Sequence, residues 1–214
     1  MQLYSFFRSS AAYRVRIALN LKGLPYHTVP LHLRREGGEH RRPAYTRLNP
    51  EGLVPALQTE GRLLTQSLAI IEYLEEIHPS PALLPRSAPD RAWVRALAQH
   101  VACEIHPINN LRVLQHLEGT LHLSEAGKRA WIGHWIRDGF DAIEERLQRD
   151  GVSGLCCYGD TPTMADCALV PQVANAVRFD VDIVRYPRIS ALWNHLRSLE
   201  SFRRAAPESQ PDAE

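Results

Sequence analysis

The chain has 214 residues, of which 44% are hydrophobic and 23% charged, and its formal net charge at pH 7 is +1. This length suits one large domain or two small ones, and it can bury a core without metal or disulfide staples. The hydrophobic content excludes a mainly disordered chain. The near-zero net charge gives no support for nucleic-acid binding.

The spacing of the cysteines and histidines indicates a reducing compartment and argues against a metal site. The four cysteines are Cys103, Cys156, Cys157 and Cys167, and no two have the C-x-x-C spacing of a zinc or redox motif. The ten histidines include no H-E-x-x-H pattern. No apolar run approaches the roughly 18 residues of a membrane span. We therefore expect a cytoplasmic protein without a membrane partner.

Residues 1–80 alternate strand and helix signals, in the order β-α-β-loop-β-β-α. Ser9 or Ser10 can N-cap the first helix, and Gly23 followed by Pro25 can end it. The predicted elements are a strand Gln2–Phe6, a helix Tyr13–Lys22, a strand Tyr26–Leu33, a hairpin of Leu53–Gln58 with Arg62–Thr65, and a helix Ser67–Ile77. These elements form an α/β unit of about 80 residues.

Residues 79–90 hold four prolines and are expected to form a linker, after which strand signals almost vanish. The predicted later elements are a helix Arg91–Leu117 kinked at Pro107, a helix Ser124–Leu147, a helix from the capping box Thr163–Asp166 to about Val177, a last helix Pro187–Ser201, and a frayed tail Pro207–Glu214. The predicted domains are therefore 1–80, a linker 81–90, and an all-helical domain 91–214.

Three motifs in the first domain place polar groups at special backbone positions. Ser9 and Ser10 stand at a strand-to-helix turn, Val54–Pro55 interrupts a strand, and Gln66–Ser67 precedes an apolar helix. A proline within a strand gives up a ladder hydrogen bond, so it implies an edge or a cis peptide. A helix N-terminus can bind a carboxylate. Taken singly, both serine motifs can equally be plain helix caps.

Charge supports a small anionic ligand for this domain. Residues 1–80 carry ten Lys and Arg against seven Asp and Glu, so the first domain is mildly basic while the remainder is mildly acidic. An excess this small favours a small anion over a polymer.

Together with Asn109-Asn110-Leu111-Arg112 and the stretch 159–166, these motifs resemble the zeta class of glutathione transferases over residues 2–212. The resemblance implies a thioredoxin-like α/β domain followed by an all-α domain, a homodimer, and glutathione as cofactor. Its nearest members by resemblance are maleylacetoacetate and maleylpyruvate isomerases.

The resemblance implies glutathione-dependent cis–trans isomerisation of maleylacetoacetate to fumarylacetoacetate in tyrosine and phenylalanine catabolism. In such a reaction a thiolate adds to the alkene, the bond rotates while single, and the thiolate leaves. The alternatives are isomerisation of maleylpyruvate in the gentisate pathway, or transfer of glutathione to α-haloacids. A member of a different class, a non-enzymatic glutathione-binding protein, would be expected to lack the turn hydroxyls.

The resemblance also assigns roles to residues. Ser9 would hold the thiolate with help from Ser10, and Arg8 beside them is a catalytic candidate. The candidate glutathione ligands are Ser9, Ser10, His40, Val54, Pro55, Gln66, Ser67, His106 and Asn110. The candidate ligands for the substrate carboxylates are Arg8, Arg112 and Arg178, because a guanidinium can bind a carboxylate through two hydrogen bonds. His106 can equally fill a domain interface, Arg112 can equally be a solvated surface residue, and Thr163 and Asp166 are interpreted as structural caps.

One position departs from the class pattern. The class usually has Ser-Ser-Cys at the turn, whereas this chain has Ser9-Ser10-Ala11. The protein therefore has no sulfur of its own there, which argues against a reductive dehalogenase or thiol–disulfide enzyme. Isomerisation is unaffected because its working sulfur belongs to glutathione.

Overall fold

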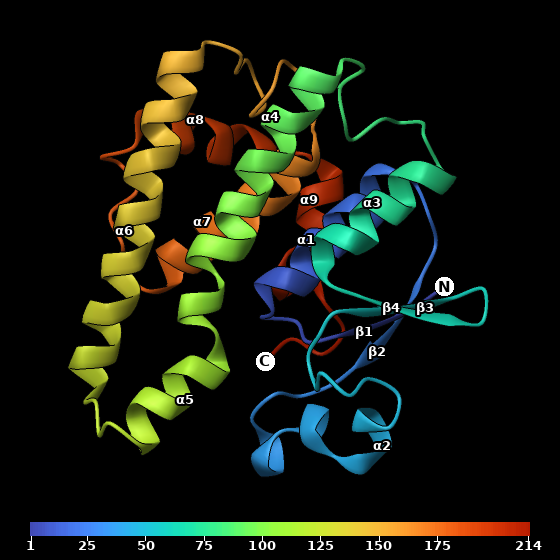
Figure 1. Ribbon diagram of the computed structural model, residues 1–214, viewed down its shortest axis with the longest axis vertical. Coiled ribbons are helices and arrows are strands. Elements are labelled where there is room, and N and C mark those ends of the chain that lie inside the picture. The colour runs from blue at the N-terminus through green and yellow to red at the C-terminus, as the bar shows by residue number, and fades with distance from the viewer. The chain divides into compact units, whose positions relative to one another are not determined.

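The computed structural model describes all 214 residues, which divide into two units: Met1–Leu83 with Ser198–Glu214, and Leu84–Arg197 (Figure 1). The domain boundaries predicted at residues 80 and 91 stay a prediction. The division by contacts differs from them at the C-terminus, because Ser198–Glu214 returns to the first unit. None of the helices is both long enough and apolar enough to cross a membrane.

The first unit is built on a four-stranded sheet in the order β2-β1-β3-β4. Strand β1 is parallel to β2 and antiparallel to β3, which pairs with β4 in a hairpin. The strands are β1 (Gln2–Ser5), β2 (His27–Pro30), β3 (Ala56–Thr59) and β4 (Arg62–Thr65). The thioredoxin-like α/β class predicted for this part of the chain is confirmed.

Helices lie on both faces of this sheet. Helices α1 (Ser10–Leu21) and α3 (Ser67–Ile77) pack side by side, and α1 also contacts α9 (Glu200–Ala205). In Figure 1 the short helix α2 (Pro43–Thr46) lies on the other side of the strands from α1 and α3. Alternation along β1 explains the layers: Ser5 bonds to α1, whereas the Tyr4 ring contacts Tyr45 of α2 with 5.6 Å between centroids.

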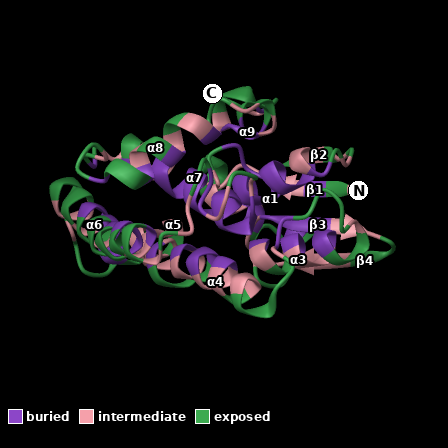
Figure 2. Cartoon of the chain, turned by 90° about the horizontal axis from the view of Figure 1, so that it is seen from above, coloured by how far each residue is buried: buried purple, intermediate pink, exposed green.

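The second unit is all helical. Its helices are α4 (Ala88–Gln99), α5 (Leu111–Gly119), α6 (Glu125–Asp150), α7 (Met164–Arg178) and α8 (Pro187–Leu196). Helix α7 is almost wholly buried, as Figure 2 shows, and it contacts both α4 and α8. The predicted apolar stripe of Val94, Leu97, Val101 and Ile105 is buried.

Several predicted elements differ from the structure. The first helix begins at Ser10 instead of Tyr13, and the hairpin strand predicted over Leu53–Gln58 is Ala56–Thr59. The helix predicted over 91–117 is broken: a π-helical segment His100–Ile105 and a 3-10 turn Pro107–Asn109 separate α4 from α5. Proline at 107 explains the break, because it has no N–H and clashes with the preceding turn. The last predicted helix is two helices, α8 and α9, and the predicted strand Tyr26–Leu33 is only His27–Pro30.

The prediction of a frayed tail over 207–214 is wrong. Residues Pro207–Ser209 form a 3-10 turn, and Gln210 is buried with its side-chain nitrogen donating to the carbonyls of Arg204 and Ala206, each at 2.9 Å. Within the first unit, Asp212 accepts from the Phe7 N–H, and Glu214 lies 3.5 Å from His32 Nε2. A polar composition therefore did not mean disorder here, since the polar groups have partners elsewhere in the chain.

Candidate functional site

Strand register gathers eight candidate residues at one edge of the sheet. Ser5, the last residue of β1, is paired with Pro30, the last of β2, while Ala56 at the start of β3 is paired with Thr65 at the end of β4. Tyr4 is paired with Ala56, which aligns the two pairs. The segments that follow or precede these strand ends therefore leave the sheet at the same edge. They carry Arg8, Ser9, Ser10, His40, Val54, Pro55, Gln66 and Ser67.

Ser9 is the N-cap of α1, which fixes the direction of its hydroxyl. Its backbone is extended (φ −69°, ψ 114°), and its Oγ accepts from the Ala12 N–H at 3.2 Å. Because that bond uses an oxygen lone pair, the hydroxyl proton is available to donate to another group. Capping and thiolate binding are therefore compatible in one residue. Ser10 is the first helical residue and is half-buried.

The turn between β1 and α1 is held by a buried arginine. The Arg16 guanidinium is fully buried and donates to Phe7 O at 3.0 Å, Phe6 O at 3.5 Å and Ser5 Oγ at 3.0 Å. Its Nε donates to Ala205 O of α9 at 2.9 Å. Burial lowers the pKa of Arg16 to about 10, so the group remains a cation at neutral pH.

Arg8 is exposed and lies over its neighbouring ring. The central carbon of its guanidinium is 4.8 Å from the centroid of Phe7, which is buried. A cation on a ring face at this distance is attracted by the ring's electron density. Arg8 therefore has a preferred direction while its donors stay accessible to a carboxylate.

His40 lies at the end of the loop that follows β2, in a 3-10 turn Glu39–Arg41. It is buried, and its Nδ1 has no hydrogen-bond partner. Burial and the nearby Arg41 cation lower the pKa of His40, so it is neutral at pH 7. The neighbouring Gly38 needs to be glycine: its φ is +101°, and a Cβ there would lie 2.4 Å from the His40 ring.

The segment before β3 has a cis peptide bond between Val54 and Pro55, as the interrupted strand pattern suggested. The preceding carbonyl, that of Leu53, accepts from the Tyr45 hydroxyl at 2.6 Å and from Asn49 Nδ2 at 3.0 Å. These two side chains fix the approach of the chain to Val54, which is half-buried, while Pro55 is buried.

Gln66 and Ser67 form the start of α3, and both are held by polar contacts. Gln66 has a positive φ of 66°, a conformation that is strained for a residue with a side chain. Its Nε2 donates to Glu51 at 3.0 Å. The Ser67 Oγ is buried and accepts from Nη1 of the buried Arg14 at 3.1 Å. A cation thus stands beside a helix N-terminus, an arrangement that favours a bound anion.

The other four candidates lie in the second unit. His106 is half-buried next to Pro107, and Asn110 is the half-buried residue that precedes α5. Arg112 is exposed in the first turn of α5. Arg178 is exposed at the last residue of α7, with its guanidinium 5.2 Å from the Phe179 ring centroid.

Thr163 and Asp166 have structural bonds that account for both side chains. The buried Asp166 accepts from the Thr163 N–H at 2.7 Å, the Thr163 hydroxyl at 2.8 Å and the Cys157 N–H at 2.8 Å. Burial raises the pKa of Asp166 against these bonds, which lower it. The two residues thus cap α7 and tie the preceding loop to it.

Sequence reasoning missed four polar residues that shape the first unit. Arg14 and Arg16 brace Ser67 and the β1–α1 turn, Glu51 holds Gln66, and Asp212 accepts from the Phe7 N–H at 3.0 Å. The only local signal was two arginines inside an otherwise apolar helix. Their helical spacing puts them near the core-facing stripe, where a charge is found only with partners.

The residues at the sheet edge fit a polar peptide ligand. The Ser9 hydroxyl has a proton to donate, the buried His40 Nδ1 has an unmet bond, and Ser67 stands at a helix N-terminus beside Arg14. A buried polar atom without a partner is uncommon and suggests a ligand that satisfies it. Glutathione carries carboxylates, amides and a thiol, so its groups match this donor set.

Comparison with known proteins identifies the family of this chain. Residues 3–82 match the family of glutathione S-transferase N-terminal domains. The chain is 54% identical over 213 residues to a maleylpyruvate isomerase from a Ralstonia species, covering 100% of both chains. It is 50% identical over 211 residues to a probable maleylacetoacetate isomerase from Vibrio cholerae, covering 99% of this chain and 97% of that one.

Two solved structures share the whole fold. A holo maleylpyruvate isomerase, described as a bacterial zeta-class glutathione transferase, has a TM-score of 0.97 at 53% identity over 100% of both chains. A maleylacetoacetate isomerase from Methylobacterium extorquens, with bound malonate and glutathione, has a TM-score of 0.96 at 37% identity, again over 100% of both chains. The fold and these matches define a glutathione transferase. The chain belongs to the zeta class of that family.

Proposed function

We propose that the protein is a glutathione-dependent cis–trans isomerase that converts maleylacetoacetate to fumarylacetoacetate. The observation that carries the proposal is the Ser9 turn: a hydroxyl fixed by its cap bond, with a proton to donate, on the residue that follows the exposed Arg8. The reaction needs both groups: the hydroxyl holds the thiolate of glutathione, and the guanidinium binds a carboxylate of the substrate. Relatives named for this isomerisation reach 50% identity over nearly their full length, which supports the proposal.

Glutathione supplies the chemistry as a thiol that adds to the alkene carbon as thiolate and leaves again after the bond has turned. Ser9 holds the sulfur by donating its hydroxyl proton, which stabilises the charged form and lowers the thiol's pKa from its ordinary value of about 8.5. Ser10 and the amides that open α1 assist. Arg8 neutralises charge at the reacting end of the substrate.

The remaining sheet-edge residues orient the tripeptide. Val54 beside Pro55 offers backbone groups for its peptide bonds, and Gln66 with Ser67 receives the γ-glutamyl end, where Arg14 adds positive charge. His40 satisfies its buried nitrogen on the same ligand. His106 and Asn110 are further proposed glutathione ligands, and Arg112 and Arg178 bind substrate carboxylates. The proposed working form is a homodimer in the cytoplasm, with domains at 1–80 and 91–214.

Maleylpyruvate is the second candidate substrate. The observation that favours it is the similarity to the Ralstonia maleylpyruvate isomerase, which at 54% identity exceeds that to the Vibrio protein. The two substrates differ only in the chain beyond the ketone. Side-by-side measurement of kcat/KM on both decides between them.

The test of the proposed function is cofactor stoichiometry. Because the residue at 11 is alanine, the turn has no sulfur of its own. Purified protein should isomerise a maleyl ketoacid only with added glutathione, whose concentration stays constant through many turnovers. Stoichiometric consumption of glutathione would indicate a transferase instead. Full activity without any thiol, or binding of glutathione without turnover, would contradict the proposal.

A further inference from the structure

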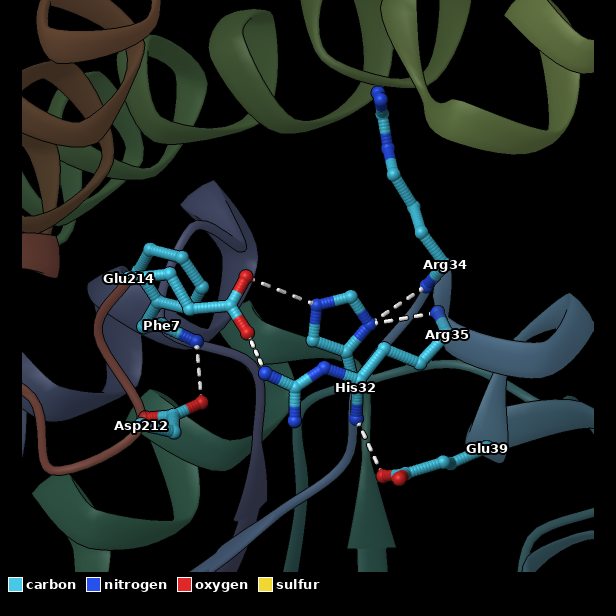
Figure 3. Close-up of polar contacts among 7 residues, drawn as sticks. All are labelled: Phe7, His32, Arg34, Arg35, Glu39, Asp212 and Glu214. Carbon is cyan, nitrogen blue, oxygen red and sulfur yellow. Dashed lines mark hydrogen bonds and ion pairs between the residues drawn. The ribbon is translucent and has the colours of Figure 1, made fainter.

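The C-terminal segment reaches the turn that carries Arg8 and Ser9. The Phe7 N–H donates to Asp212 Oδ2 at 3.0 Å, across 205 positions of the sequence, as Figure 3 shows. Phe7 and Arg8 are the two central residues of this turn, which the bond from the Ser9 N–H to Phe6 O closes at 2.9 Å. A bond to Phe7 therefore acts on the backbone immediately before Arg8.

Asp212 and Arg16 hold opposite sides of the same peptide groups. Arg16 donates hydrogen bonds to the carbonyls of Phe6 and Phe7, while Asp212 accepts one from the amide of Phe7. With the carbonyls and the amide both bonded, the peptide planes of the turn cannot rotate without breaking a bond to a charged group. Such bonds are about twice as strong as those between neutral groups.

The tail is anchored on both sides of Asp212. Before it, Gln210 is buried and bonded to two carbonyls at the end of α9. After it, Glu214 pairs with Arg35 and lies 3.5 Å from His32 Nε2 (Figure 3). The His32 Nδ1 accepts from the Arg34 and Arg35 N–H groups at 3.1 and 2.8 Å, so the proton of the neutral ring is on Nε2 and faces Glu214.

The Asp212 carboxylate is poorly satisfied for a purely structural group. Its Oδ1 is buried without a hydrogen-bond partner, while Oδ2 has the Phe7 amide. An unpaired buried oxygen opposes folding, so it offsets part of what the bond from the Phe7 amide to Oδ2 contributes to stability. A carboxylate that leaves one oxygen unpaired, while the other bonds to the backbone next to two site residues, is better explained by the turn that it orders.

We propose that Asp212 is a positioning residue of the site: through the Phe7 amide it fixes the turn that aims the Ser9 hydroxyl and the Arg8 guanidinium. The proposal rests on the proposed roles of Ser9 and Arg8. Asp212 touches neither glutathione nor substrate in this role. Its effect is on the direction of the two groups that do, and therefore on the thiol's pKa and on kcat.

The test compares variants that keep or remove the acceptor at position 212. Asp212→Ala and Asp212→Leu have no acceptor, and leucine keeps a similar branched shape if alanine does not fold. Asp212→Asn loses the charge, but its amide oxygen can still accept from Phe7. Glu208→Gln, at an exposed carboxylate in the same segment, is the matched control for charge. Each purified full-length variant is titrated for the pKa of bound glutathione by thiolate absorbance and assayed for kcat and KM.

The variants without an acceptor should raise the apparent pKa of bound glutathione by about one unit and lower kcat about tenfold at fixed pH below that pKa. Their KM for glutathione should change less than kcat. Asp212→Asn should stay close to wild type in pKa and kcat, and Glu208→Gln should not differ from it. A role in stability alone predicts instead a lower melting temperature with an unchanged thiol pKa.

Two results overturn the proposal: alanine and leucine variants with wild-type pKa and kcat, or an asparagine variant as impaired as they are. The second result would mean that charge, not the bond to Phe7, is what matters. Failure of the proposed function is a separate outcome, because wild-type protein would then show no glutathione-dependent isomerisation at all.

Discussion

The two units hold their candidate residues in opposite ways. In the first unit Ser9, His40 and Ser67 are buried or half-buried, and sheet register together with the buried Arg14 and Arg16 holds their surroundings. In the second unit the arginine candidates Arg112 and Arg178 are exposed on helix ends. The first unit presents mainly groups fixed by the core, with the exposed Arg8 and Gln66 as exceptions, whereas the arginine candidates of the second unit are long side chains on its surface.

This difference matches what each region is proposed to bind. Glutathione is the same molecule in every turnover, so a site fixed by backbone register suits it. Exposed side chains can be replaced without disturbing the core, since surface substitutions usually change stability by less than about 0.5 kcal/mol.

The largest expected effect separates stability from ligand binding in the second unit. Asp166→Ala removes the acceptor for two buried N–H groups and a hydroxyl, so it should lower the free energy of unfolding by about 3 kcal/mol or more. Urea denaturation measures the loss. The control is Asp138→Ala, at an exposed position of α6. Loss of kcat per folded molecule without loss of stability would place Asp166 in the site and break the comparison.

The exposed arginines are tested in both units, with Arg8 in the first and Arg178 in the second. Removing one partner of a desolvated charge pair costs about 2–5 kcal/mol, so Arg8→Ala and Arg178→Ala should each lower kcat/KM on a dicarboxylate substrate at least about tenfold. The KM for glutathione should stay nearly unchanged. Lysine at either position should restore activity only in part, because a point charge cannot bind a carboxylate with two parallel bonds.

Two further arginines sharpen this result. Arg62 is exposed at the opposite end of the sheet, so Arg62→Ala is the control and should have wild-type kcat/KM. The kcat/KM of Arg112→Ala decides whether Arg112 binds a substrate carboxylate together with Arg8 and Arg178. If the alanine variants of Arg8 and Arg178 both keep near-normal kcat/KM, the carboxylate assignment is wrong.

Substitution of Ser9 tests the groups that the core of the first unit holds in place. A hydrogen bond to a charged group is worth about 1.5–3 kcal/mol, and 1.36 kcal/mol corresponds to one pKa unit. Because the hydroxyl stabilises the thiolate, its removal should raise the pKa: Ser9→Ala should shift the titration of bound glutathione upward by roughly one to two units. Ser10→Ala should shift it less. Identical titration curves for wild type and Ser9→Ala would show that Ser9 does not stabilise the thiolate.

The smallest effect is expected at position 11. Ala11→Cys introduces the thiol that the class usually has at this turn, but the sulfur that reacts belongs to glutathione. Isomerase kcat/KM should therefore change less than about twofold, well under the tenfold change that 1.36 kcal/mol produces. A large gain in activity with the cysteine would show that the turn sulfur takes part in the isomerisation.

Sequence alone determined the elements whose physics is local. The helix Ser67–Ile77 and the strand Arg62–Thr65 have the predicted bounds, because apolar periodicity and the Glu60-Gly61 turn are written in neighbouring residues. The Ser9 cap and the special bond before Pro55 were readable for the same reason. Ser9, Val54 and Gln66 could be proposed as site residues because each stands next to a helix start or a proline that the sequence reveals.

Only the tertiary structure decided which distant segments share an environment. Arg16 is buried because oxygens from β1, the turn and α9 converge on it, and no pattern within one helix encodes that convergence. The tail appeared frayed because its polar composition resembles that of a free end, yet Asp212 bonds to Phe7 across 205 positions. Long-range pairing of polar groups leaves no periodic signal in the sequence, since it depends on where the backbone brings the partners.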